Sequence, residues 1–163
     1  MTSSAQRAPT EAATAVVLDD TAKAIIEQLQ QDGRRPYATI ARAVGLSEAA
    51  VRQRVQRLIE TGVMQIVAVT DPLTLGFRRQ ALIGLRVEGD LNAVADRLVA
   101  TPEVDYVVIS AGSFDLLVEV VCEDDDHLLA LLNDKIRSIA GVRATETFVY
   151  LRLRKQTYTW GTR

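Results

Sequence analysis

The apolar positions between residues 18 and 58 recur at intervals of three and four, which is the spacing of helices that bury one face. The first predicted helix ends in the segment DGRRP, because glycine and proline break helices. A second, from about Tyr37 to Val44, should stop at Gly45, a residue suited to a left-handed backbone. Ser47 should cap a third helix with its side-chain oxygen, and Gly62 should close it. The apolar faces of the three helices contain Leu18, Ile25, Ile26 and Leu29, then Ile40, Ala41 and Val44, then Val51, Val55 and Leu58.

From residue 63 onward the pattern includes short runs rich in β-branched residues, which predict strands. The run VMQIVAVT (63–70) predicts a strand after the third helix, and the expected architecture of the first domain is a (winged) helix-turn-helix. Further strands are predicted at 81–87, 105–111, 115–123 and 144–155, and helices at 91–99 and 128–139. This βαββαβ order is that of a ferredoxin-like sandwich, in which two helices cover an antiparallel sheet, so the fold class is α+β.

These patterns divide the chain into five parts. They are a flexible tail (1–17), a helix-turn-helix domain (18–62), a strand and linker (63–79), a ferredoxin-like domain (80–156) and a C-terminal tail (157–163). The sheet face opposite the two helices would be an aggregation hazard if it were exposed. We therefore expect a second copy of the chain to cover it.

The positive charge of the chain is concentrated in one segment. The 163 residues have a formal net charge of −2, which argues against general attraction to nucleic acid. Residues 34–57 nevertheless contain six arginines and a single acid, Glu48. This excess falls on the second and third predicted helices and the segment before them, where a DNA-binding surface would need it.

Composition also bears on the compartment. No apolar run approaches the roughly 20 residues that span a bilayer, and the N-terminus does not resemble a secretory signal. The single cysteine, Cys122, lies in an apolar run and is expected to be a buried thiol. We expect a soluble protein of the cytoplasm that has no membrane partner.

The segment ARAVGLSEAAV has the features of a helix-turn-helix. Ala41 allows two helices to approach, Gly45 makes the turn, and Val51 packs the second helix on the first. On the outward side of the third helix, base-reading positions are predicted at Ser47, Glu48, Ala49, Arg52, Gln53 and Gln56. Phosphate contacts are predicted for Arg34, Arg35, Arg54 and Arg57. The alternative is a three-helix module for protein interaction that has a solvated basic face.

These residues resemble a known family. The run from Leu18 to Gly76, with DGR, IA…VGLS, V..RV.RL and GV before a strand, is similar to the helix-turn-helix domain of the Lrp/AsnC (leucine-responsive, feast/famine) transcriptional regulators. The βαββαβ pattern with AGSFDLLVEV resembles the effector-binding and assembly domain of that family. The resemblance covers about residues 18–155.

The resemblance implies a homodimer formed through the C-terminal sheets, commonly assembled into octamers. It also implies that an amino acid or related metabolite binds between neighbouring C-terminal domains. By motif match, the ligand-binding residues are Gly112, Ser113, Phe114, Asp115, Thr145 and Thr147. Phe114 stands where the family more often has tyrosine, and Pro36 where a serine-like cap usually begins the second helix.

Other chemistry has little support in the sequence. The segment CEDDDH (122–127) holds three consecutive acids and the single histidine, but consecutive acids at a helix start point in different directions, so we expect no metal site. The chain has no phosphate-cradling glycine loop and no nucleophile with evident partners, so we expect neither cofactor nor enzyme activity.

The expected function is a regulator that binds an imperfectly palindromic DNA operator and responds to a small metabolite. Two alternatives stay open at this stage. One is an architectural, nucleoid-type DNA organiser with little ligand control. The other is an enzyme, or an enzyme regulatory subunit, with an amino-acid-sensing ferredoxin-like domain.

Overall fold

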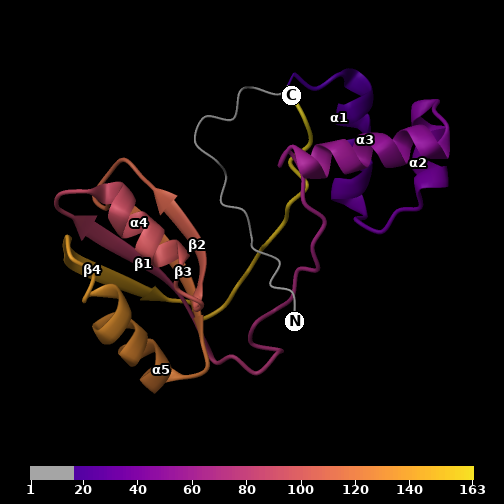
Figure 1. Ribbon diagram of the computed structural model, residues 1–163. Helices are drawn as coiled ribbons and strands as arrows, with labels where there is room; N and C mark the ends of the chain where they lie inside the picture. The colour runs from indigo at the N-terminus through magenta and orange to yellow at the C-terminus, as the bar shows by residue number, and fades with distance from the viewer. Residues whose placement is uncertain (1–16) are drawn as a thin grey trace. The chain divides into compact units, whose positions relative to one another are not determined.

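The computed structural model of the chain describes residues 17–163, which form two compact units (Figure 1). One unit contains residues 17–68 together with the C-terminal segment Lys155–Arg163, and the other contains Val69–Arg154. The predicted flexible tail, apart from residue 17, lies outside the described residues. No helix in the described part of the chain is both long enough and apolar enough to cross a membrane.

The first unit is built on three helices, α1 (Asp20–Gln31), α2 (Tyr37–Val44) and α3 (Glu48–Glu60). The end of α1 before the segment DGRRP, the end of α2 before Gly45 and the start of α3 after Ser47 all agree with the sequence prediction. The Ala22 amide donates to the Asp19 carboxylate (2.7 Å) at the start of α1, and the Ala50 amide donates to Ser47 Oγ (3.2 Å) at the start of α3. Gly45 ends α2 with φ of 69°, a left-handed conformation that favours glycine.

The core of this unit is the predicted set of inward-facing apolar residues. Ile25, Ile40, Val51 and Val55 are buried together where the three helices meet, and Leu58 belongs to a neighbouring cluster with Ala22 and Ile26. Met64, just beyond α3, packs against both clusters. The helical period therefore predicted both the elements and the side that each helix buries.

The strand predicted at residues 63–70 is wrong for the isolated chain. The Val63 and Met64 amides still donate to the Leu58 carbonyl, but residues 65–70 are exposed and pair with no strand in the described residues. β-branched residues favour an extended backbone, yet a strand needs a hydrogen-bonded neighbour to form. The wing that this strand was expected to supply is correspondingly absent from residues 17–68.

The second unit is a four-stranded antiparallel sheet in the order β2-β3-β1-β4, with its helices on one face (Figure 1). Its elements are β1 (Arg79–Val87), α4 (Leu91–Val99), β2 (Val104–Ile109), β3 (Leu116–Cys122), α5 (Asp125–Ala130), the π-helical continuation η1 (Leu131–Ile136) and β4 (Val142–Val149). The ferredoxin-like topology is as predicted. Its core joins Ile83 and Leu85 of β1 and Val118 of β3 to Leu98 of α4 and Ile136 of η1, all fully buried.

Two predicted boundaries in this unit are wrong. Helix α5 begins at Asp125 rather than near residue 128, because the Asp124 carboxylate caps it by accepting a hydrogen bond from the His127 amide (2.9 Å). The last strand ends at Val149, although the β-like sequence continues to residue 155. Val149 pairs with Ala81 close to the beginning of β1, so little of β1 is left for residues beyond it to pair with.

The face of the sheet opposite the helices is partly apolar and contains Phe114. The Phe114 ring lies over Gly84 of β1, where a Cβ atom would come within 2.6 Å of the ring. Phe148 of β4 meets Phe114 edge-to-face, with ring centroids 6.3 Å apart. Tyr106 and Phe148 remain 59% and 43% exposed on this chain. Gly84 thus allows an aromatic side chain to rest directly on the backbone of the sheet.

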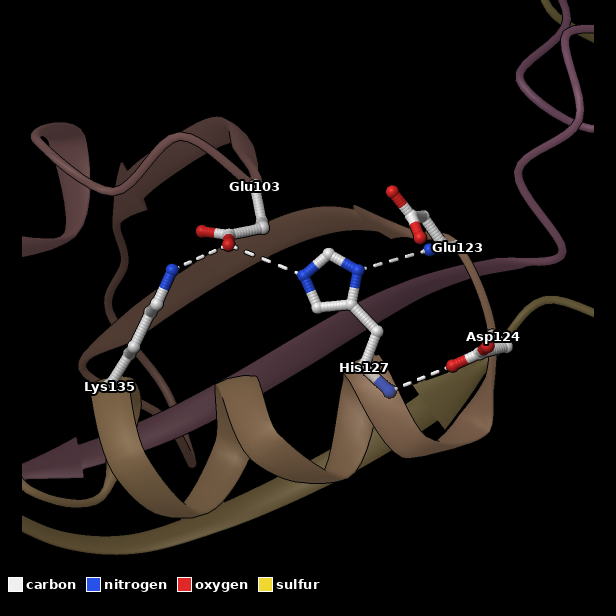
Figure 2. Close-up of polar contacts among 5 residues, drawn as sticks. All are labelled: Glu103, Glu123, Asp124, His127 and Lys135. Carbon is white, nitrogen blue, oxygen red and sulfur yellow. Dashed lines mark hydrogen bonds and ion pairs between the residues drawn. The ribbon is translucent and has the colours of Figure 1, made fainter.

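A cluster of charged side chains connects α5 and η1 to Glu103, the residue that precedes β2 (Figure 2). His127 Nε2 (3.3 Å) and Lys135 Nζ (2.5 Å) both contact Oε1 of Glu103, whose side chain is only 14% exposed. The Glu123 amide donates to Nδ1 of the same histidine (3.3 Å). The hydrogen bond from Lys135 is the main reason that the pKa of Glu103 lies below its ordinary value. These contacts satisfy Oε1 of Glu103, whereas its buried Oε2 atom has no hydrogen-bond partner among the described residues.

The contact between Gly84 and Phe114 predicts a strong coupling between the two positions. We expect Gly84→Ala to destabilise the chain by about 1–3 kcal/mol, because the added methyl group displaces the ring. Adding Gly84→Ala to Phe114→Ala should cost much less than adding it to the wild type, as measured by urea unfolding in a double-mutant cycle. Strict additivity of the two substitutions would contradict this account.

The Glu103 cluster predicts a pH-dependent contribution of Lys135 to stability. When folding lowers the pKa of a carboxyl group, that group stabilises the fold at pH values above its pKa in the unfolded chain. The contribution is lost as the pH falls through the pKa of the group in the folded chain. We therefore expect Lys135→Gln to reduce the free energy of unfolding by about 1 kcal/mol at pH 7 and by less below about pH 4. Urea unfolding at both pH values measures the difference.

The matched control is Arg143→Gln, which removes a cation from the solvent-exposed pair with Glu88 and should change stability little at either pH. A loss of stability in Lys135→Gln that stays constant between pH 7 and pH 4 would show that the charge of Glu103 is not involved.

Candidate functional site

Helix α3 presents two faces with different chemistry. Val51, Val55 and Leu58 are buried against α1 and α2. Glu48, Ala49, Arg52, Gln53, Gln56 and Arg57 are exposed on the remaining surface. Because the Gly45 turn and the Ser47 cap begin the helix at a defined residue, the orientation of both faces is fixed with them. The predicted base-reading residues therefore share one accessible surface.

Arg52 is held in place by two neighbours. Its Nη2 atom contacts Glu48 Oε1 (2.9 Å) one turn earlier, and its guanidinium group lies over the ring of Tyr37, 5.2 Å from the centroid. The side chain nevertheless remains 65% exposed. Such contacts reduce the number of rotamers available to a long side chain. Arg52 is thus partly ordered without being covered, and Tyr37 is a supporting residue that the sequence analysis did not identify.

Gln53, Gln56 and Arg57 lie further along the same surface. The Gln56 amide donates to Glu60 Oε1 (2.9 Å). Within residues 17–163, no hydrogen bond involves the side chains of Gln53 and Arg57. Glutamine pairs with adenine edges and arginine pairs with guanine or phosphate, so these side chains suit contact with a nucleic acid.

The flanking arginines differ from one another. Arg34 is exposed, whereas Arg35 is half-buried and donates through Nη1 to Gln28 and Gln31 of α1. Arg54 is also half-buried, and its Nη1 atom contacts Asp19 Oδ2 (2.7 Å). A hydrogen bond from Arg54 is the main cause of the lowered pKa of Asp19, the cap of α1.

Arg54 therefore joins the start of α1 to α3 within the helical unit. The local excess of arginine predicted a phosphate contact for Arg54, because its partner Asp19 lies 35 residues away in the chain and local charge does not reveal it. Arg42 of α2, which was counted in the local charge but assigned no contact, is exposed and donates to Thr39 Oγ1 (3.4 Å).

The hairpin predicted to bind a ligand joins β2 to β3. Asp115 is held by the backbone of β1, because its Oδ2 atom accepts from the Val87 amide (2.8 Å) and its own amide donates to the Leu85 carbonyl (2.9 Å). The pairing of β1 with β3 ends at Leu85 and Leu116, so the Val87 amide lies beyond the last residue of β3 that could serve as its ladder partner. The Asp115 carboxylate satisfies that group.

The other hairpin residues surround an open turn. Gly112 and Ser113 are exposed, and no heavy atom lies within 4 Å of where a Cβ of Gly112 would be. The Ser113 carbonyl accepts from Arg86 Nε (3.1 Å), and the Arg86 guanidinium lies 5.9 Å from the centre of the Phe114 ring. The hairpin thus places a carboxylate, a guanidinium group and an aromatic ring around accessible backbone.

Thr145 and Thr147 lie on the other face of the sheet from Phe114. They pair with Leu85 and Ile83, whose side chains are buried under the helices, and directly paired residues share a face. Thr145 Oγ1 accepts from Arg137 Nε (3.0 Å), beyond the end of η1. A single chain therefore does not bring the two threonines together with the hairpin.

Metal-binding and nucleophilic groups are sparse. Among residues 17–163, no cluster of three or more histidine, cysteine or acidic residues is arranged to hold a metal ion. Cys122 is fully buried, as predicted, and burial raises the pKa of its thiol to about 11. A protonated, inaccessible thiol is a poor nucleophile.

Comparison with known proteins agrees with this arrangement. An AsnC-type helix-turn-helix domain matches residues 18–59, and a C-terminal dimeric alpha+beta barrel domain matches residues 77–163. The HTH-type transcriptional regulator FL11 of Pyrococcus furiosus is 37% identical over 143 residues, which cover 86% of this chain and 94% of that protein. The HTH-type transcriptional regulator Rv2324 of Mycobacterium tuberculosis is 34% identical over 137 residues, 82% of this chain and 92% of the relative.

Solved structures share the fold. The transcriptional regulator NMB0573 of Neisseria meningitidis, crystallised as a complex with L-Met, superposes with a TM-score of 0.75 at 24% identity, covering 88% of this chain and 96% of that one. AsnC of Escherichia coli gives a TM-score of 0.73 at 24% identity over 88% of this chain and 99% of its own. Both domains and their order match, and the chain belongs to the Lrp/AsnC family of helix-turn-helix transcriptional regulators.

Proposed function

We propose that this protein is a sequence-specific regulator that binds double-stranded DNA through α3 and responds to an amino acid or a related metabolite. The observation that supports DNA reading most directly is the exposed surface of α3, where Arg52, Gln53 and Gln56 lie side by side on a helix whose opposite face is buried. Arginine and glutamine are the side chains best suited to guanine and adenine edges in the major groove.

In this proposal the residues of the surface have different tasks. Arg52, already positioned by Glu48 and Tyr37, reads a base without losing much rotamer freedom on binding. Ser47, Glu48, Ala49, Gln53 and Gln56 complete the base-reading set, and Arg34 and Arg57 contact phosphates. Arg35 and Arg54 contribute charge while they hold the helices together.

The acting species is proposed to be a homodimer. The described chain leaves Tyr106 and Phe148 exposed on the open sheet face, and the C-terminal domain is of a dimeric type. Two α3 helices related by a two-fold axis would enter successive major grooves about 34 Å apart, so the operator should be an imperfect palindrome. Assembly of dimers into an octamer is the further expectation.

The base-reading role of Arg52 and the phosphate role of Arg57 predict different binding defects. Arg52→Ala should lower discrimination between the preferred and a mismatched site by about 1–3 kcal/mol. Arg57→Ala should weaken binding to every sequence and reduce the slope of log affinity against log salt concentration by about 1. Fluorescence anisotropy with duplexes that the wild-type protein selects from a random library measures both effects.

The matched control is Arg143→Ala, which removes an exposed arginine from β4 and should leave DNA binding unchanged. Unchanged operator affinity and sequence preference in Arg52→Ala would show that α3 is not the base-reading helix. Failure of the wild-type protein to retain any duplex at moderate salt would instead support the protein-interaction module.

The effector site is proposed at the β2–β3 hairpin. The carboxylate of Asp115 suits an ammonium group, the Arg86 guanidinium suits a carboxylate, and the exposed turn leaves room for the ligand backbone. The complex of NMB0573 with L-Met shows that a protein of the same fold binds an amino acid. Thr145 and Thr147 would join this site only from a different copy of the chain, since within one chain they face the opposite side of the sheet.

The hairpin site predicts a charge-dependent ligand effect. An amino acid at 100 times its dissociation constant should stabilise the protein by about 2.7 kcal/mol, which a thermal-shift screen of the amino acids detects. Asp115→Asn should abolish that shift while keeping the fold, because the asparagine oxygen still accepts from the Val87 amide. Asp96→Asn, on the exposed side of α4, should respond as the wild type does.

A ligand shift that survives in Asp115→Asn would remove Asp115 from the site. No shift with any amino acid, together with DNA binding of weak sequence preference, would favour the architectural alternative.

A further inference from the structure

The last nine residues of the chain belong to the helical unit, although β4 of the other unit precedes them. Lys155–Arg163 groups with residues 17–68, and the yellow C-terminal segment ends beside α1 in Figure 1. The C-terminal unit, Val69–Arg154, is therefore inserted between two segments of the helical unit. It is joined to that unit by the chain at both of its ends.

Three hydrogen bonds attach the C-terminal segment to α1. The Gly161 amide donates to Gln30 Oε1 (3.0 Å), and the Gln30 side-chain amide donates to the Gly161 carbonyl (3.5 Å). Thr162 Oγ1 donates to Glu27 Oε1 (2.6 Å). Gln30 and Glu27 are three residues apart and so lie on one side of the helix. One glutamine amide thus pairs with both polar groups of a single residue of the segment.

The sequence of the segment suits this attachment. Gly161 has φ of 76°, a conformation that residues with a Cβ adopt at a cost. Gly161 and Thr162 are partly buried, whereas residues 151–160 are exposed. Tyr158 and Trp160 pack edge-to-face, with ring centroids 6.3 Å apart. The contact is therefore localised at the end of the chain, after an exposed stretch that leads there from β4.

We propose that residues 155–163 form a strap that fastens the end of the C-terminal unit to α1 of the DNA-binding unit. The strap is an integral part of the DNA-binding unit, held by Gln30 and Glu27. It gives the two units a second connection besides the linker that follows α3. A body attached through two chain segments has fewer accessible orientations than one attached through a single segment.

The strap also has a consequence that rests on the proposed function. It follows β4 after residues 150–154, and Phe148 of β4 packs on Phe114 of the proposed effector hairpin. A shift of β4 on effector binding would reach α1 through the strap as well as through the linker. The strap would thereby restrict the spacing of two DNA-binding units in a dimer, on which binding to a two-part operator depends.

Hydrogen exchange of the full-length protein, without DNA, tests the attachment itself. The Gly161 amide should exchange more slowly than in an unstructured peptide, and Gln30→Ala should accelerate its exchange about fivefold, the effect of losing one hydrogen bond. Gln31→Ala is the matched control, because Gln31 is the adjacent glutamine of α1, is exposed and has no hydrogen bond to the strap. Unprotected Gly161 in the wild type, or equal rates in wild type and Gln30→Ala, would overturn the strap.

A photocrosslink determines whether the strap acts within one chain. Arg163→p-benzoylphenylalanine places a photoreactive group next to Thr162 in the full-length protein. The strap predicts crosslinks to α1 in a product of monomer mass on a denaturing gel. Crosslinks found only at dimer mass, or none to α1, would overturn the attachment within one chain.

DNA binding tests the consequence separately. On duplexes selected by the wild type, Gln30→Ala should bind a fragment with two half-sites about fivefold more weakly and a fragment with one half-site as before. Equal effects on the two fragments would overturn the coupling but not the strap. Absence of DNA binding by the wild type would instead refute the proposed function and leave the exchange and crosslinking results valid.

Discussion

The burial of one apolar stripe of α3 determines which of its side chains are available to a partner. Val51 and Val55 are in contact with the α1 and α2 core and almost fully inaccessible, so the helix cannot rotate about its axis without exposing them. Arg52, Gln53 and Gln56 are presented to solvent as a consequence of that packing. The chemistry of the surface therefore depends on a hydrophobic contact on the opposite side of the helix.

Several charged residues near the proposed sites already form hydrogen bonds or ion pairs with other groups of the protein. Arg54 contacts the cap of α1, and Asp115 accepts a hydrogen bond from the Val87 amide, which lies beyond the last pair of β1 with β3. Such residues are shared between fold and function, because removing one of them exposes an unsatisfied group as well as changing the site. Substitutions that keep the hydrogen bond and remove only the charge separate the two roles.

The sequence predicted the elements whose signals are local. Helical period, the Gly45 stop and the Ser47 cap predicted the bounds of α2 and the start of α3, and the βαββαβ order predicted the sheet. The wrong or missed predictions concern segments whose structural partners are distant in the sequence or are not found among the described residues. Among residues 17–163 the β-like run at 63–70 has no strand beside it, and the face of Thr145 depends on its register with Leu85, sixty residues away in the chain. The strap was missed for the same reason, since its partner on α1 is 131 residues distant.

The features that a single chain leaves unsatisfied have a common explanation in assembly. The open sheet face retains the exposed aromatic rings of Tyr106 and Phe148, and the β-like segment that includes Ile66 and Val69 has no strand to pair with. Apolar side chains and unpaired extended segments are unfavourable in water, and both are relieved by contact with another sheet or strand. The C-terminal domain is of a dimeric type, which agrees with the proposal that a second copy covers the open sheet face. Within one chain, the helical core is buried, whereas this face of the sheet keeps aromatic rings exposed to water.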